Sequence, residues 1–167
     1  VVQLQPHPLG GAVDGDAEGV DDQEDQHRVV TQAAELLEVM QELSDLAGAG
    51  IQVALEFHWN KLVSEHGTPP GTGDEMGFVV LGMGKLAGGE LNFSSDVDLI
   101  FLCAGEDGRT IGDQSISSKR FYEALAQALT RSLNDVTEEG FVFRVDLRLR
   151  PEGEMGELVP SVGNALH

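Results

Sequence analysis

Cysteine is nearly absent from this sequence of 167 residues, and Cys103 is the single one. One cysteine excludes an internal disulfide and a zinc site built from several cysteines. Basic residues are also scarce, with 10 Lys and Arg against 29 Asp and Glu, which gives a formal net charge of −19. Because a strongly acidic surface repels the phosphates of nucleic acids, we expect no nucleic-acid partner.

Long apolar runs are missing as well. No run approaches the ~20 apolar residues that span a bilayer, so we expect no membrane partner. The first residues, 1–6, contain neither a basic segment nor the apolar stretch of a signal peptide. We therefore expect a cytoplasmic protein.

Three regions of the chain differ in composition. Residues 1–28 carry many carboxylates among glycines and prolines, and we expect an acidic, disordered tail. Residues 29–76 place apolar residues at helical spacing before a stretch rich in glycine and proline, which predicts a helical lead-in and a loop. Residues 77–167 alternate short apolar runs with a helical pattern, and we expect them to form the core domain, cut short at its C-terminal end.

The lead-in is predicted to contain two helices. Apolar residues recur every three to four positions over Thr31–Ala47 and again over Ile51–Glu65. Gly48 and Gly50 lie between these segments and are predicted to end the first helix, because glycine is a poor helix former.

The core region predicts an α/β (α+β) fold with a small mixed sheet flanked by helices. Short apolar runs predict strands over 78–81 and 96–102, separated by a glycine-rich turn over 82–89. A helix is expected over 118–136, and strict alternation predicts a third strand over 141–150.

Residues 152–167, which follow this third strand, are expected to be irregular.

Two carboxylates lie close together at the start of the second predicted strand. Asp96 and Asp98 are two residues apart, so they point to the same face of a strand. Side by side, the two charges repel each other, and a divalent cation removes this penalty. Hard oxygen ligands suit Mg²⁺, although an Asp-x-Asp pair taken alone is also common at solvated strand ends.

The third predicted strand strengthens the interpretation as a metal site. One of its faces is apolar, and the other carries Arg144, Asp146, Arg148 and Arg150. A surface face of ion pairs is one explanation. The other is a third metal-binding carboxylate flanked by arginines that bind phosphate. If the two strands are neighbours, three aspartates converge, as a two-metal site for phosphoryl or nucleotidyl transfer requires.

The glycine-rich turn allows backbone N–H groups to approach an anion, and Lys85 adds a mobile positive charge beside Gly84. The pattern Gly82-x-Gly84-x-x-Ala87 also matches a dinucleotide-binding fingerprint. That alternative lacks an acidic residue that ends a second strand about twenty positions further on, and the segment after the turn reaches Asp96-x-Asp98 instead.

Two segments of this sequence closely resemble the glutamine synthetase adenylyltransferase family. The first is Gly82-Met-Gly-Lys-Leu-Ala-Gly-Gly-Glu-Leu-Asn-Phe-Ser-Ser-Asp-Val-Asp-Leu-Ile-Phe101, and the second is Phe143-Arg-Val-Asp-Leu-Arg-Leu-Arg-Pro-Glu-Gly153. The wider resemblance is to the nucleotidyltransferase superfamily that includes polymerase beta. It implies a nucleotidyltransferase-type sheet and a chain that is a fragment of a longer enzyme.

The resemblance implies a set of site residues. Asp96, Asp98 and Asp146 would be the catalytic residues and the ligands of Mg²⁺. The groups expected to bind phosphates, with ATP, ADP and phosphate as substrates, are Gly84, Lys85, Ser94, Ser95, Arg144, Arg148 and Arg150.

The resemblance also implies a function and partners. Family members attach AMP from ATP to a tyrosine of glutamine synthetase, or remove it by phosphorolysis to give ADP, and PII signal-transduction proteins select the direction. The segment Asn92–Ser95 and the segment Pro151–Val159 favour the adenylyl-removing half. The alternative is a truncated or inactive module of the same fold that binds a nucleotide or a partner without turnover.

Overall fold

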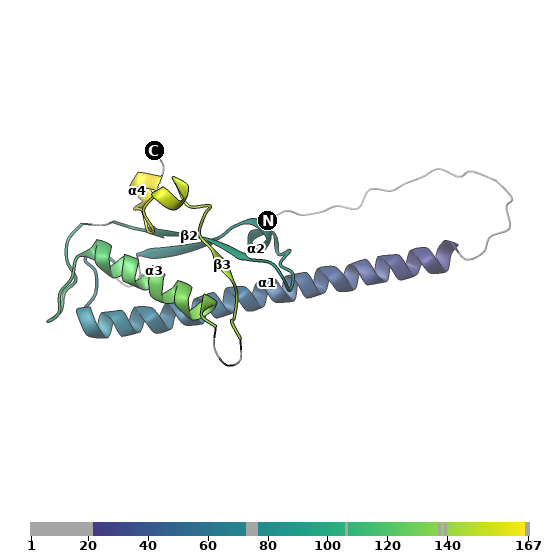
Figure 1. Cartoon of the computed structure of the whole chain (residues 1–167), viewed down its shortest axis with the longest axis horizontal. Coiled ribbons are helices and arrows are strands. Elements are labelled where there is room, and N and C mark those ends of the chain that lie inside the picture. The colour runs from purple at the N-terminus through teal and green to yellow at the C-terminus, as the bar shows by residue number, and fades with distance from the viewer. Residues whose placement is uncertain (1–21, 73–76, 106, 137, 139, 166–167) are drawn as a thin grey trace. The chain divides into compact units, whose positions relative to one another are not determined.

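The computed structural model describes residues 22–72, 77–105, 107–136, 138 and 140–165 (Figure 1). The chain divides into two units between Ala34 and Glu35, and the sheet, the core and the candidate site all lie in the second. The expected disordered tail lies outside the described residues as far as position 21. From Asp22 onward the chain is helical, so the prediction of disorder is wrong for residues 22–28.

The lead-in forms one helix, α1, over Asp22–His66, and not the two helices predicted. Gly48 and Gly50 lie inside it. A Cβ at either glycine would meet nothing within 4 Å. Each glycine costs about 1 kcal/mol relative to alanine. Burial of Ala47 and Ile51 on the two sides of Gly48 offsets this cost, so the helix continues.

A three-stranded mixed sheet confirms the predicted α/β fold class (Figure 1). Its strands are β1 (Phe78–Gly82), β2 (Val97–Cys103) and β3 (Val145–Asp146). The order is β1-β2-β3, with β1 antiparallel and β3 parallel to the central strand. The first two strands were predicted within one or two residues of their ends.

The central strand β2 forms because every second residue enters the core. Val97, Leu99, Phe101 and Cys103 are each at most 1% exposed, and the residues between them are half-buried. Helices α1 and α3 (Ser118–Asn134) supply the opposing side chains and cover the same face of the sheet (Figure 1). The predicted helix over 118–136 is thus confirmed. The other face of β2, which carries Asp98, points away from these helices.

The predicted third strand over 141–150 is wrong in length, since β3 has only two residues. Before it, the Phe143 N–H donates to Leu133 O at the end of α3, 2.9 Å away. After it, the chain turns, and the Arg150 N–H donates to Leu147 O at 3.4 Å. Alternation in sequence marks a possible strand, but a strand also needs a neighbour to pair with.

The rest of that edge of β2 is taken by the C-terminal segment. The Cys103 N–H donates to Pro160 O at 3.1 Å, and Cys103 pairs in a parallel bridge with Ser161. Val159 is buried at 3% exposure. The segment also contains a 3-10 helix, η1 (Gly153–Met155), and α4 (Val162–Ala165), so the prediction of irregular structure is only partly right.

Of the helices that the structure describes, none combines the length and the apolar character that a membrane crossing needs.

Candidate functional site

The two strands place Asp98 and Asp146 next to each other. They are partners in the parallel register of β2 and β3, so both side chains start from the same face of the sheet. This is the face turned away from α1 and α3, because the neighbours of Asp98, Val97 and Leu99, are both completely buried on the helix side. The neighbouring position of the two strands, on which the predicted convergence of the aspartates depends, is therefore present.

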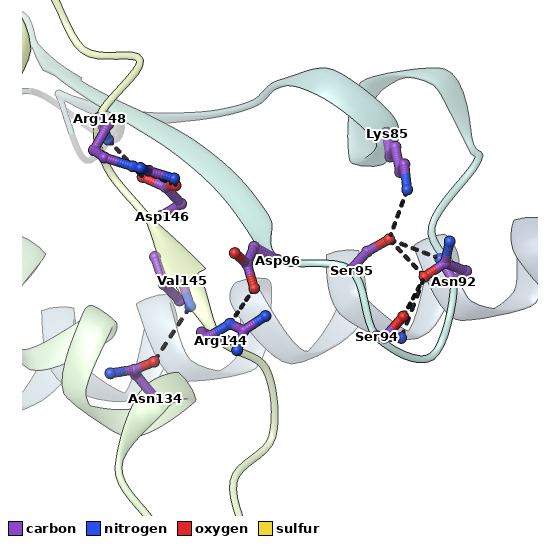
Figure 2. A network of polar contacts seen from close by, with 10 residues as sticks. All are labelled: Lys85, Asn92, Ser94, Ser95, Asp96, Asn134, Arg144, Val145, Asp146 and Arg148. Atoms are coloured by element: carbon purple, nitrogen blue, oxygen red, sulfur yellow. Dashed lines mark hydrogen bonds and ion pairs between the residues drawn. The ribbon is translucent and has the colours of Figure 1, made fainter.

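Asp96 lies just before β2 and contacts the other strand through an arginine. Its Oδ1 accepts a hydrogen bond from Nε of Arg144, which precedes β3 (Figure 2). The Arg144 carbonyl also accepts the Val97 N–H at 2.8 Å. The Asp96 side chain is 34% exposed and that of Arg144 is 63% exposed, so the arginine is the more exposed partner of the pair.

Asp146 is bound by Arg148, two residues further along the chain (Figure 2). Nε of the guanidinium lies 3.0 Å from Oδ1 and 2.8 Å from Oδ2, and Nη2 contacts Oδ2 as well. The Arg148 backbone N–H donates to Oδ1 at 2.8 Å. These side-chain and backbone hydrogen bonds lower the pKa of Asp146, so the group is ionised at neutral pH.

The glycine-rich turn contains a short helix, α2 (Gly84–Gly88), that lies against Asp98. The Met83 N–H donates to Asp98 O at 2.9 Å. Gly84 has a φ of +54°, and a Cβ there would lie 2.7 Å from Oδ2 of Asp98. Glycine is needed here for two reasons, the left-handed backbone and the close approach of the carboxylate.

Lys85, Ser94 and Ser95 are brought together beside this turn (Figure 2). Nζ of Lys85 donates to Oγ of Ser95 at 3.4 Å. Asn92 holds both serines, because its Oδ1 accepts the Ser95 hydroxyl at 2.9 Å and the Ser94 N–H at 3.2 Å. Asn92 had no assigned role from the sequence. An asparagine followed by serines is typical of a turn closed by the side chain, and this signal could have identified it.

Arg150 is the predicted site residue whose described contacts lie elsewhere. Its Nη1 donates to Leu147 O at 3.1 Å, within the turn that follows β3. Its predicted contact with phosphate stays a prediction.

The donor set fits Mg²⁺ in kind, because the carboxylates on β2 and β3 are hard oxygen ligands on one face. The side chains are not yet arranged as a closed site. Over the ranges that the structure describes, no three His, Cys, Asp or Glu side chains gather closely enough to hold a metal ion. For Asp96 and Asp146 to join Asp98 as metal ligands, their contacts with Arg144 and Arg148 would first have to break.

The strand directions argue against the dinucleotide-binding alternative. That fingerprint belongs to a parallel strand–helix–strand unit. Here β1 and β2, the strands on either side of the Gly82–Ala87 pattern, are antiparallel.

A small mixed sheet, with carboxylates on its open face beside a glycine turn, defines an α/β fold of the nucleotidyltransferase type. Comparison with known proteins identifies the family. The model of the glutamate-ammonia ligase adenylyltransferase family matches residues 26–167. The chain belongs to this family, and the resemblance seen in the sequence is confirmed.

Curated relatives share about half of their aligned residues with this chain. Proteins named bifunctional glutamine synthetase adenylyltransferase/adenylyl-removing enzyme are 48% identical in Nitrosomonas eutropha over 77% of this chain, and 48% in Pseudomonas putida over 83%. One from Thioalkalivibrio sulfidiphilus is 50% identical over 75% of this chain. The matched regions cover 13–14% of the relatives, so the chain spans about a seventh of their length.

Proposed function

We propose that this chain is the catalytic core of a Mg²⁺-dependent nucleotidyltransferase that adds AMP to, or removes it from, a tyrosine of glutamine synthetase, and so regulates nitrogen assimilation. Family membership and the names of the relatives support the substrate. The observation that carries the proposal is the pairing of Asp98 with Asp146 on the open face of the sheet, beside Gly84.

In this proposal Asp96, Asp98 and Asp146 hold Mg²⁺. A bound divalent cation supplies positive charge that polarises the phosphoryl group and stabilises the leaving oxygen. Asp98 is the best placed of the three, because its backbone is fixed by buried neighbours and its carboxylate lies against the turn. Asp146 extends the donor set from the neighbouring strand.

The turn and the serines are proposed to bind phosphate oxygens. Gly84 keeps the backbone close to Asp98, so an anion held at the turn would lie near the carboxylates. Lys85 is held by Ser95 at the same place and brings the compensating charge. Asn92 positions Ser94 and Ser95.

Arg144, Arg148 and Arg150 are proposed to neutralise the phosphates of ATP, ADP or inorganic phosphate. Arg144 and Arg148 have exposed guanidinium groups beside the carboxylates, so they can reach a ligand on this face. An arginine presents a planar fork of donors that matches phosphate oxygens.

We favour the removing direction. The segments Asn92–Ser95 and Pro151–Val159 resemble the adenylyl-removing half, and the relatives are named for both activities. In removal, an oxygen of inorganic phosphate bonds to the phosphorus of the AMP group, and the bond from that phosphorus to the tyrosine oxygen breaks. ADP forms, and the tyrosine oxygen takes up a proton.

We further propose that a PII signal-transduction protein is the regulatory partner and that the chain acts in the cytoplasm. Both parts of the proposal rest on the family resemblance. Binding of a purified PII protein to the chain, measured by isothermal titration calorimetry, tests the partner.

A second candidate is a module of this fold that binds nucleotide or a partner without turnover. The contacts of Arg144 with Asp96 and of Arg148 with Asp146 favour it, because they occupy two of the three carboxylates proposed to hold the metal. Calorimetric titration with ATP and Mg²⁺ separates the two. Binding combined with no transfer under any condition supports the second candidate.

The test of the main proposal is Asp98→Asn. Adenylylated glutamine synthetase, phosphate and Mg²⁺ are incubated with the chain, and with the Pseudomonas putida relative carrying the equivalent substitution, and ADP is measured. We expect a loss of about 100-fold or more, since a fixed charge at the reacting group is removed. Asp113→Asn, in an exposed loop, is the matched control. Near-normal ADP production by Asp98→Asn would contradict the metal role.

A further inference from the structure

Two of the three aspartates on the open face are each bound by an arginine, and both arginines flank the same short strand. Arg144 precedes β3 and binds Asp96, which lies just before β2, and Arg148 follows β3 and binds Asp146. Asp98, the third aspartate, lies against Gly84 of the turn. The arginine contacts therefore coincide with the two carboxylates that a metal ion would need in addition to Asp98.

We infer that Arg144 and Arg148 are exchangeable counter-ions, which occupy Asp96 and Asp146 in the metal-free protein and release them when a divalent cation binds. The inference rests on the proposed function, since it assumes that the carboxylates hold the cation. It adds that metal binding at this site is a competition between the cation and two side chains of the same chain.

The exposures of the four side chains support an exchange in this direction. The Asp146 side chain is 13% exposed and that of Arg148 is 71% exposed; for Asp96 and Arg144 the values are 34% and 63%. In each pair the arginine is thus the more exposed partner and the carboxylate the more buried one. Ion pairs with exposed partners contribute little to stability, so a cation can displace them.

The backbone keeps the carboxylates in place during the exchange. Asp146 also accepts the Arg148 backbone N–H at 2.8 Å, a contact that does not depend on the guanidinium. The Val97 N–H bond to Arg144 O, at 2.8 Å, ties the two strands together in the same way. Movement of the guanidinium groups therefore frees carboxylate oxygens without separating β2 from β3.

The released arginines would then face the ligand phosphates. A guanidinium that leaves a carboxylate needs another set of oxygens, and phosphate offers a similar geometry. Arg144 and Arg148 lie two residues before and two residues after Asp146. Their two guanidinium groups would therefore reach a phosphate held near the aspartates from two sides. Binding of the cation and of phosphate would in this way favour each other.

The experiment measures Mn²⁺ binding to the complete chain without nucleotide, by electron paramagnetic resonance of the free ion. We expect Arg148→Ala and Arg144→Ala each to bind Mn²⁺ about two- to fivefold more tightly than the unchanged chain, as loss of a competing exposed ion pair predicts. Arg131→Ala is the control for loss of one positive charge, because α3 packs on the opposite face of the sheet. It should leave the affinity unchanged.

Arg148→Lys separates competition from simple charge. Lysine keeps the charge but cannot make the two-pronged contact with Asp146, so it should also bind Mn²⁺ more tightly than the unchanged chain. If only the alanine variant gains affinity, the effect is general electrostatics and the inference is wrong. Unchanged or weaker binding by both alanine variants also overturns it.

A second measurement follows the arginines directly and does not need arginine variants. In the nuclear magnetic resonance spectrum of the complete chain, Mg²⁺ should shift the Nε–H signals of Arg144 and Arg148 and leave that of Arg131 in place. Mn²⁺ binding that Asp98→Asn abolishes, with no change in the arginine signals, would overturn the exchange alone. An unchanged chain that binds no Mn²⁺ would overturn the proposed function as well.

Discussion

Strands β2 and β3 both carry carboxylates to the open face, but they are held in place in different ways. β2 has seven residues, and four of them are buried in the core at 1% exposure or less. β3 has two residues, both half-buried, and it meets β2 only through the pairs Val97–Val145 and Asp98–Asp146. Deep burial of Val97 and Leu99 therefore fixes the position of Asp98, whereas Asp146 lies between Val145 and Leu147, which are only partly buried against the core.

The difference indicates that the two sides of the site have different roles. The β2 side, with α2 and the turn held by Asn92, is held in place by packing and backbone hydrogen bonds. The β3 side carries the arginines, and its carboxylate is bound by a side chain that can move. A site that must admit both a cation and phosphate needs one part that stays in place and one that exchanges partners.

The largest effect that tests this comparison concerns stability. Leu99→Ala removes a completely buried side chain from β2 and should lower the free energy of unfolding by about 3 kcal/mol. Val145→Ala, on half-buried β3, should cost about 1 kcal/mol. Urea unfolding followed by circular dichroism measures both values. Equal losses would mean that β3 is as firmly packed as β2.

A smaller effect on stability and on Mn²⁺ binding is expected from a substitution in the glycine turn beside β2. Gly84→Ala puts a methyl group 2.7 Å from Oδ2 of Asp98 and strains a backbone with φ of +54°. Gly71→Ala is the matched control, because its φ is +77° and its Cβ would meet nothing within 4 Å. Both should lose about 1 kcal/mol of stability from the backbone. We expect only Gly84→Ala to weaken Mn²⁺ binding as well, and an equal weakening in both variants would show that the carboxylate contact is unimportant.

Much of the fold could be predicted because its signals are local. Strand β2 is a short apolar run, and helix α3 has an apolar face, with Phe121, Leu125 and Leu129 in the core. The spacing of Asp96 and Asp98 predicts a shared face of the strand. The neighbouring position of Asp146 was a conditional prediction, and the register of β2 and β3 fulfils the condition.

Other features depend on contacts that the sequence does not display. Gly48 and Gly50 argue for a break in α1, but packing on both sides of them outweighs the propensity of single residues. The long third strand was predicted from alternation alone, and the edge that it needed is partly occupied by Pro160 and Ser161.

The pairing of each arginine with its aspartate also depends on the tertiary structure. The sequence places Arg144 and Arg148 equally close to Asp146, two residues on either side. Only the structure shows that one binds Asp146 and the other reaches across to Asp96.

The most direct test of the account is a crystal structure of the chain grown with Mn²⁺ and ATP, in which anomalous scattering locates the manganese. We predict a manganese peak in contact with carboxylate oxygens of Asp98 and Asp146, with the guanidinium of Arg148 turned from Asp146 toward the phosphates. A manganese ion bound elsewhere, while Arg148 still covers Asp146 in the presence of ATP, would contradict it.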